Sequence, residues 1–393
     1  MGEAVGARVE IATSLATVEA AAWNALANPE PATYNPFVDH AFLTALETSG
    51  SVGNRSGWIP RHLLIREDGR LVGAMPAYAK LHSQGEYVFD HGWADAYHRA
   101  GGQYYPKLQI AVPFTPVPGP RLLTVPGPAG DAPRALLAEG AAQFCRQAGM
   151  SGAHVTFCSE ADWNALATHG YLKRTDQQFH WSNEGYETFD DFLAALASRK
   201  RKTVRKEREQ ALAAGLEIVW LSGSEIEEAH WDAFFEFYMD TGSRKWGRPY
   251  LNRRFFSELG SSMAERCLLI MAKRDGRWIA GALNLIGGDC LYGRYWGAVE
   301  HHPCLHFEVC YYQAIAYAIR HKLARVEAGA QGEHKLARGY MPTATYSAHW
   351  IADPALRRAI ARYLEEERRH VAEQRDMLAE FAPYRKAPAP EDA

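Results

Sequence analysis

Side chains that can do acid–base chemistry are densest between Tyr292 and Trp350 of this 393-residue chain. Ionisable residues alternate there with small and apolar ones, as they do where the strand ends of an open α/β sheet meet a ligand. Such groups could deprotonate a nucleophile, stabilise an oxyanion and protonate a leaving group. The candidate catalytic residues are Lys335, Glu333, Glu308, His334 and Tyr312. A buried ion-pair network is the alternative interpretation of the same residues.

Large aromatic side chains accompany this stretch and recur in the first half of the chain. Trp and Tyr carry a polar atom as well as apolar area, so they suit a binding cleft as much as a core. The candidate substrate-binding residues are Trp93, Tyr104, Tyr105, Tyr295 and Trp296, together with the cation Arg338. Packing in the core or between domains is the alternative role for these aromatic residues.

A basic run interrupts a chain whose formal net charge is only −3. Seven of the ten residues from Arg199 to Arg208 are basic and one is acidic. Apolar spacing predicts a helix over 189–214 that carries this run. The candidate phosphate-binding residues are Arg199, Lys202, Arg205 and Lys206, with RNA, a nucleotide-linked sugar or a lipid phosphate as the ligand. A solvated helix face is the alternative, and base stacking is not expected because no aromatic residue interrupts the run.

Two similar successions of elements are predicted to position these residues. Asp68-Gly69 and Asp275-Gly276 each mark a tight hairpin between apolar runs. After each hairpin we expect a strand, a helix, a strand, a helix and a strand. The sequence therefore predicts an α/β fold with mixed sheets, in two tandem domains over 1–182 and 183–385, followed by a flexible tail over 386–393.

Several kinds of site are excluded by missing patterns. No G-x-G triplet occurs among the 33 glycines, which removes the dinucleotide fingerprint, and there is no P-loop or H-E-x-x-H pattern. We predict no metal site and no tightly bound cofactor. The six cysteines form no C-x-x-C pair, and no apolar run reaches membrane-spanning length. A cytoplasmic protein without a membrane span is therefore expected.

Three segments give the chain a family resemblance. They are Phe89-Asp90-His91-Gly92-Trp93-Ala94, Tyr104-Tyr105-Pro106-Lys107-Leu108 with Pro113-Phe114-Thr115-Pro116, and Gly329-Ala330-Gln331-Gly332-Glu333-His334-Lys335 with Arg338-Gly339. These motifs resemble the FemAB-like family of bacterial proteins. The order of elements resembles a GNAT N-acyltransferase fold present twice, as in the FemABX aminoacyl transferases of peptidoglycan bridge synthesis.

The resemblance implies transfer of an acyl or aminoacyl group to an amine. By position in the fold, Lys335 resembles the FemABX lysine that assists with the acceptor or the RNA phosphate. The acyl-CoA signature [QR]-x-x-G-x-[GA] has no full match, and the nearest miss, at Arg146-Gln147-Ala148-Gly149-Met150-Ser151, is expected to end a helix.

The donor is therefore expected to be aminoacyl-tRNA or acyl-CoA, with the former favoured by the basic run. The acceptor is expected to be an amine on a small molecule or a peptidoglycan precursor, and DNA is not expected as a partner. An acyl-CoA-dependent N-acetyltransferase and a non-catalytic protein that binds a cell-wall precursor or nucleotide-linked ligand stay open as alternatives. The oligomeric state also stays open.

Overall fold

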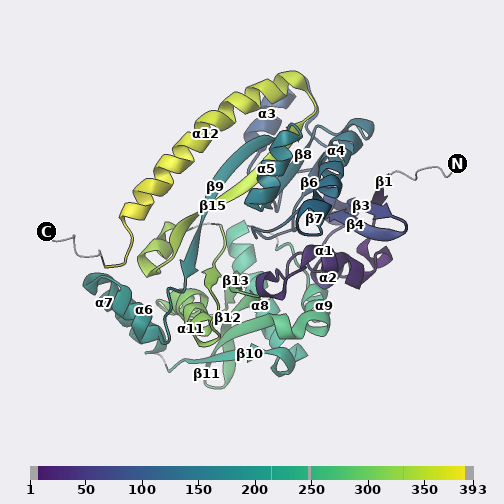
Figure 1. Ribbon diagram of the computed structural model, residues 1–393. Coiled ribbons are helices and arrows are strands. Elements are labelled where there is room, and N and C mark those ends of the chain that lie inside the picture. The colour runs from purple at the N-terminus through teal and green to yellow at the C-terminus, as the bar shows by residue number, and fades with distance from the viewer. Residues whose placement is uncertain (1–7, 214, 247–248, 331, 386–393) are drawn as a thin grey trace. The chain divides into compact units, whose positions relative to one another are not determined.

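The computed structural model describes residues 8–213, 215–246, 249–330 and 332–385 (Figure 1). The tail predicted over 386–393 lies outside these residues. The chain divides into two compact units, and β9 (Leu172–Ser182), β15 (Met341–Ile351) and the long helix α12 (Pro354–Glu380) each run from one unit into the other. Unit 1 comprises 1–176, 250–262 and 344–372, and unit 2 comprises 177–249, 263–343 and 373–393.

Unit 1 contains two groups of strands, ordered β1-β3-β4-β7 and β15-β8-β6-β5-β2. The parallel pair is β6 with β8, and the other pairs are antiparallel. Its strands are β1 (Arg8–Ala12), β2 (Trp58–Pro60), β3 (His62–Glu67), β4 (Arg70–Met75), β5 (Ala77–Lys80), β6 (Lys107–Ile110), β7 (Leu123–Thr124) and β8 (Gly152–Cys158). Its helices are α1 (Ala20–Ala27), α2 (His40–Thr48), α3 (His91–Arg99), α4 (Asp131–Gln147), α5 (Glu160–Thr168) and most of α9 (Arg253–Met263).

Unit 2 contains one mixed sheet in the order β10-β11-β12-β13-β14-β9. Only β13 and β14 run parallel. The strands are β10 (Glu217–Ser222), β11 (Cys267–Arg274), β12 (Arg277–Ile286), β13 (Cys290–Ala298) and β14 (Arg325–Glu327). The helices are α6 (Phe189–Ala195), α7 (Ser198–Leu212), α8 (Glu228–Trp246), α10 (Leu305–Phe307), a π-helical segment (Glu308–Tyr312) and α11 (Gln313–Arg320).

The two predicted hairpins are confirmed, and their turns explain the Asp-Gly pairs. Asp68 and Gly69 have φ of 50° and 79°, and Asp275 and Gly276 have φ of 51° and 76°. Two successive positive φ values match the twist of the flanking strands, and Gly and Asp tolerate them best. The mixed α/β fold class is likewise confirmed, since each unit passes from a hairpin through a helix to a parallel strand.

The single basic helix predicted over 189–214 is two helices. Thr188 caps α6 through a capping box with Asp191, and α6 ends at Ala195. Leu196 is extended, because its side chain is fully buried and its backbone bridges to Tyr384. The chain re-enters a helix at Ser198, so the basic run occupies α7 alone. Apolar spacing did not reveal this break, which depends on a contact far along the chain.

Gly297 tests how β13 packs on α8. A Cβ atom at Gly297 would lie 2.0 Å from the carbonyl oxygen of Phe237 in the α8 backbone, which cannot move aside like a flexible side chain. We expect Gly297→Ala to lower the free energy of unfolding by about 3 kcal/mol or more. Gly92→Ala is the control, because its Cβ would meet open space in an exposed helix. Thermal unfolding of both variants checks this, and a Gly297→Ala variant as stable as Gly92→Ala would contradict it.

Candidate functional site

The candidate site of unit 2 begins where β13 and β14 separate. The two strands pair over three residues, and their pairing ends at Tyr292 and Glu327. Immediately after Gly293, the register between β12 and β13 shifts, so that Arg294 becomes an extra residue between Gly293 and Tyr295. A β-bulge of this kind bends a strand and redirects its side chains. The bulge therefore coincides with the gap between the parallel strands.

A pocket of about 100 Å³ lies at this gap. It is lined by Ala282, Asn284, Gly293, Arg294, Tyr295, Trp296, His306, Cys310, Tyr311 and Ala328. Asn284 is fully buried, and its Oδ1 accepts no hydrogen bond from the described residues. Since buried acceptors are almost always paired, this oxygen is suited to receive an N–H or O–H from a ligand. The substrate-binding candidates Tyr295 and Trp296 both line the pocket.

Lys335 contacts the pocket wall through the backbone of Ala328. Its Nζ donates hydrogen bonds to the backbone oxygens of Ala328 at 2.6 Å and Gly329 at 3.0 Å, and its side chain is 3% exposed. Burial, with a smaller contribution from the positive charge of Arg294, lowers the pKa of Lys335 to about 7. Two carbonyl acceptors satisfy two N–H bonds of the amine and leave the third position on Nζ for proton exchange.

The helix facing the pocket contains a π-helical turn. Residues 308–312 form this turn between α10 and α11. Such turns are rare and frequently occur at functional sites. The turn places Tyr311 beside the pocket, where its hydroxyl and the Nε2 of His334 are 2.9 Å apart. His334 is exposed while Tyr311 is buried, so the pair connects the pocket wall to solvent.

Glu308 does not reach an open cleft. Its carboxylate is fully buried, with Arg208 of α7 donating at 3.0 to 3.2 Å and Gln313 donating from Nε2 at 2.7 Å. The ion-pair alternative therefore describes Glu308 better than a catalytic role. The side chain of Glu333 lies outside the part of the chain whose side chains are described.

Tyr312 and Arg338 meet at Glu207, a residue that sequence analysis missed. Arg338 binds both carboxylate oxygens of Glu207, at 2.7 and 3.1 Å, and Tyr312 donates its hydroxyl proton to the same carboxylate. Burial, and then this hydrogen bond, raise the pKa of Tyr312. The available signal was that Glu207 is the single acid within a run of seven bases. The guanidinium carbon of Arg338 also lies 3.5 Å from the ring centroid of Phe307. Tyr312 and Arg338 therefore both connect α7 to neighbouring segments.

The remaining aromatic candidates belong to unit 1. Tyr104 is buried and donates to Asp90 at 2.7 Å, while Tyr105 is hydrogen-bonded to Ser83 at 2.8 Å. Trp93 packs edge-on against His349, with ring centroids 4.9 Å apart. These residues surround a buried polar cluster rather than the pocket at β13 and β14.

Lys107 is the centre of that polar cluster. Its fully buried ammonium donates to Ser83 at 2.8 Å, Glu86 at 2.6 Å and Asp90 at 2.5 Å. Burial raises the pKa of Glu86 to about 7 and lowers that of neighbouring Lys80 to about 7. Asp90 and Lys107 each belong to one of the segments that carry the family resemblance. Nothing in the local spacing showed that the fold brings them together.

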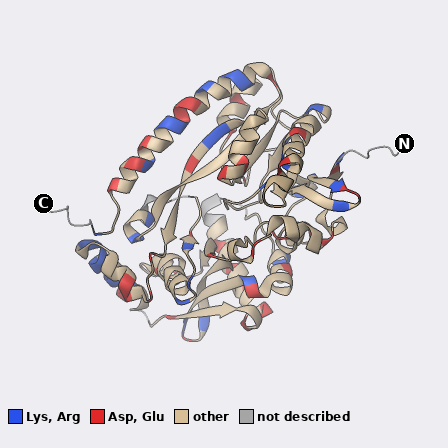
Figure 2. Ribbon diagram, viewed as in Figure 1, with Lys and Arg blue, Asp and Glu red and all other residues tan. Residues whose placement is uncertain are grey.

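The phosphate-binding candidates lie on the outer face of α7. Figure 2 shows Lys and Arg gathered on this helix, whereas both signs of charge mix along α12. Arg199, Lys202, Arg205 and Lys206 are exposed. Arg205 approaches Asp190 at 3.9 Å, a weak pairing between two exposed groups. The inner face of the same helix carries Glu207, which is bonded to Arg338 and Tyr312, and Arg208, which is bonded to Glu308.

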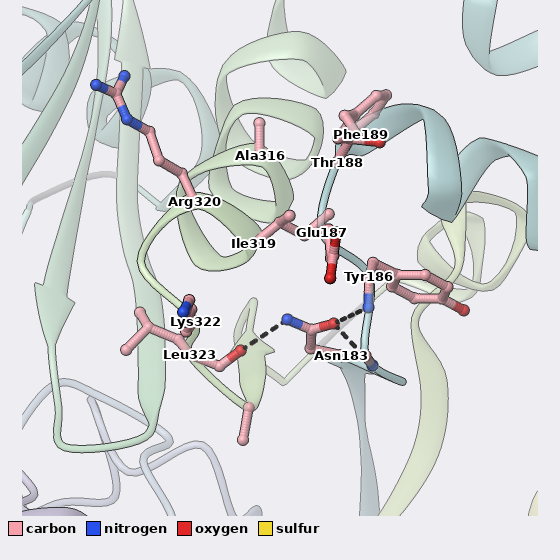
Figure 3. A pocket seen from close by; sticks show the side chains of 12 residues that line it. Asn183, Tyr186, Glu187, Thr188, Phe189, Ala316, Ile319, Arg320, Lys322 and Leu323 are labelled. Atoms are coloured by element: carbon pink, nitrogen blue, oxygen red, sulfur yellow. Dashed lines mark hydrogen bonds between the residues drawn. The ribbon is translucent and has the colours of Figure 1, made fainter.

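A wider pocket of about 800 Å³ lies between the segment before α6 and the end of α11 (Figure 3). Asn183 joins its walls, since its Oδ1 accepts from Gly185 and Tyr186 and its Nδ2 donates to Leu323. Figure 3 shows Arg320 and Lys322 at its margin. The pocket is larger than the one at β13 and β14, but it contains none of the predicted catalytic residues and is open to solvent. We therefore place the candidate chemistry at the smaller pocket.

The fold and the pocket define the class of protein. Two α/β units with mixed sheets, together with a parallel pair of strands that separates at a bulge, are the features of a tandem GNAT-like fold. The chain belongs to the FemAB-like family, described as peptidoglycan biosynthesis/recognition, whose model matches residues 14–386. No curated protein matches the chain. No described helix could span a bilayer.

Solved structures are similar in fold at low sequence identity. One is the C-terminal domain of a protein described as a lysylphosphatidylglycerol synthetase from Agrobacterium fabrum, with 10% identity, a TM-score of 0.54, and coverage of 88% of this chain and 95% of that one. A conserved protein of unknown function from Bacteroides thetaiotaomicron gives 12% identity, a TM-score of 0.52, and coverage of 88% and 100%. FemX gives 12% identity, a TM-score of 0.49, and coverage of 78% and 91%.

The pKa of Lys335 predicts how pH changes stability. Its ordinary value is 10.5 and its folded value is about 7. Between these values the unfolded chain binds more protons, so the free energy of unfolding should rise with pH. Relative to Lys335→Met, which lacks this group, the wild type should gain up to about 1.4 kcal/mol per pH unit above pH 7. Denaturant unfolding from pH 7 to 9 measures the difference, and parallel curves for the two proteins would contradict the lowered pKa.

Proposed function

We propose that the protein is an N-acyltransferase that passes an acyl or aminoacyl group to an amine at the pocket between β13 and β14. Membership of a family described as peptidoglycan biosynthesis/recognition supports the proposal. The observation that carries the proposal is the unpaired Oδ1 of Asn284 in the pocket wall, together with the buried amine of Lys335, which is hydrogen-bonded to the backbone of Ala328 in that wall. One group can accept the N–H of an incoming amine, and the other can exchange a proton near neutral pH.

The proposed reaction forms an amide and releases an alcohol or a thiol. The amine nitrogen attacks the acyl carbon of an ester or thioester, the new C–N bond forms, and the bond to the leaving oxygen or sulfur breaks. The amine loses a proton, which passes to the free lone pair on Nζ of Lys335, while the two N–H bonds already on Nζ keep donating to the carbonyls of Ala328 and Gly329. The leaving group takes up one proton, supplied by the pair Tyr311–His334, which contacts both pocket and solvent.

The outer face of α7 supports aminoacyl-tRNA as the donor. Its exposed bases lie on the same unit as the pocket, and one cation per phosphate is the interaction that RNA offers. The acceptor is an amine of a peptidoglycan precursor, or a small amine that resembles one, in keeping with the family description. Acyl-CoA stays the alternative donor.

A second candidate function is recognition without catalysis. Three of the predicted catalytic or binding side chains, Glu308, Tyr312 and Arg338, are engaged by Arg208 or Glu207. These hydrogen bonds and ion pairs hold the side chains in fixed positions, as a rigid binding site would require. Under this alternative, the pocket holds an amine through Asn284 and transfers nothing.

Replacing Lys335 separates the two functions. We expect Lys335→Met to reduce transfer of labelled amino acid from charged tRNA to an amine acceptor by at least about 100-fold, since general acid–base groups contribute about 10² to 10⁴. Lys322→Met, which changes an exposed lysine at the other pocket, should keep full rate. Circular dichroism confirms folding of both. Full turnover in Lys335→Met would remove Lys335 from the mechanism. Acceptor binding without turnover in wild type, for every donor tested, would favour the recognition protein.

The salt dependence of RNA binding tests α7. The double variant Lys202→Ala, Lys206→Ala removes two exposed cations. The negative slope of log K for tRNA against log salt should therefore become shallower by roughly 1.5. Arg362→Ala with Arg369→Ala is the matched control, because both are exposed on α12. An unchanged slope in the α7 variant, or an equal loss in the control, would show that α7 is not the RNA-binding surface.

A further inference from the structure

The edge strand β10 has the features of an unprotected pairing surface. It pairs with β11 over all six residues, from Glu217 to Ser222, and no strand among the described residues pairs with its other edge. In an antiparallel pair, alternate residues direct their N–H and C=O groups away from the partner. The outer edge of β10 therefore offers a row of backbone donors and acceptors.

The sequence of β10 lacks the usual protection of such an edge. Its central residues, Ile218, Val219, Trp220 and Leu221, are all apolar and all half-exposed. Natural edge strands are commonly short, or carry proline or charge, because these features prevent pairing between molecules. In unit 1 the strand β2 follows that rule, with three residues ending at Pro60. β10 has no proline, and its one charged residue is Glu217 at its start, bound to Lys273 at 3.0 Å.

A groove of about 590 Å³ follows this strand. Its walls come mainly from β10 and from α11. Trp220 is held there by a hydrogen bond from its Nε1 to Gln313 at 2.8 Å and by edge contact with Tyr317. The groove contains acids (Glu217, Glu225) and a cation (Arg320). Mixed charge disfavours a partner of one sign, such as a nucleic acid, and the fixed Trp220 presents a rigid apolar contact.

We propose that β10 pairs antiparallel with β10 of a second copy of this chain, forming a two-fold symmetric dimer. In an antiparallel ladder, two directly opposed residues are either both hydrogen-bonded to each other or both not. When a strand pairs with a symmetric copy of itself, the two-fold axis must therefore pass beside one residue, which then faces its own copy. Centring on Val219 opposes it to the partner's Val219 and opposes Ile218 to the partner's Trp220 on both sides of the axis. Aromatic and β-branched residues form favourable cross-strand pairs. Glu217 faces the partner's Leu221, so no acid opposes an acid.

The alternative centre is less favourable. Centring on Trp220 would pair the two Trp220 rings and oppose Val219 to the partner's Leu221, but it would oppose Ile218 to the partner's Ser222 and lose both pairs between an aromatic and a β-branched residue. The self-complementary register is the argument for a second copy rather than an unrelated peptide, because no separate partner is needed to match apolar residues along the whole strand. This inference does not depend on the acyl-transfer proposal.

Sedimentation of the full-length protein over a dilution series tests the dimer. The wild type should show twice the monomer mass at the highest concentration and dissociate on dilution. Val219→Lys should weaken association more than tenfold, because it places two ammonium groups opposite each other at the axis. Ser261→Lys, an exposed helix position, adds the same charge elsewhere and should leave the dimer intact. A wild type that stays monomeric at every concentration would overturn the proposal.

Cysteine cross-linking tests the register and does not depend on how Val219→Lys folds. With Val219 on the axis, two Val219→Cys chains lie within disulfide reach across the ladder. Mild oxidation should therefore link Val219→Cys into a covalent dimer. Leu221→Cys should not cross-link, because it faces the partner's Glu217. A dimer in which Val219→Cys fails to cross-link, or in which Leu221→Cys cross-links equally, would assign the interface to another surface.

Discussion

The candidate site depends on one costly interaction, the burial of the Lys335 amine against two backbone carbonyls. The Lys335 residue is 3% exposed to solvent, so its amine loses nearly all hydration. Among the described residues no carboxylate is bonded to its Nζ, which donates hydrogen bonds to the carbonyls of Ala328 and Gly329. These carbonyls follow directly after β14, where its pairing with β13 has ended. Strand separation frees the carbonyls, the carbonyls hold the amine, and the lack of a counter-charge keeps its pKa near neutrality.

The surroundings of Lys335 are fixed from α7. Two consecutive residues of this helix face inward, Glu207 toward Arg338 and Tyr312, and Arg208 toward Glu308. Glu207 therefore connects α7 to the segment that carries Lys335. Glu207 and Arg208 both connect α7 to the π-helical turn. Because the outer face of α7 carries the exposed bases, this helix connects the surface proposed to bind RNA to the π-helical turn that contributes Cys310 and Tyr311 to the pocket wall. These buried contacts hold Glu308 and Tyr312 in place, as the ion-pair alternative expects, and their catalytic role stays a prediction.

The fold class followed from local rules, and the site only partly did. Asp-Gly pairs demand positive φ wherever they occur, so both hairpins were predictable from two residues each. Lys335, Tyr295 and Trp296 were found because ionisable and aromatic residues cluster along the chain near a strand end. Asn284 could not be found, since its significance is an unpaired oxygen that exists only once β12 and β13 are in register. The Lys107 cluster was hidden for the same reason, as Glu86, Asp90 and Lys107 meet only through tertiary contacts.

The most direct measurement is a crystal structure of the protein with a stable amide analogue of an aminoacylated RNA 3′ end. The account predicts the analogue's carbonyl in the pocket between β13 and β14, with an amide N–H on Asn284 Oδ1 and Lys335 within one water of the carbonyl. An analogue bound with its carbonyl beside Lys107 in unit 1, or outside both sites with Asn284 Oδ1 still unpaired, would contradict the assignment of acyl transfer to this pocket.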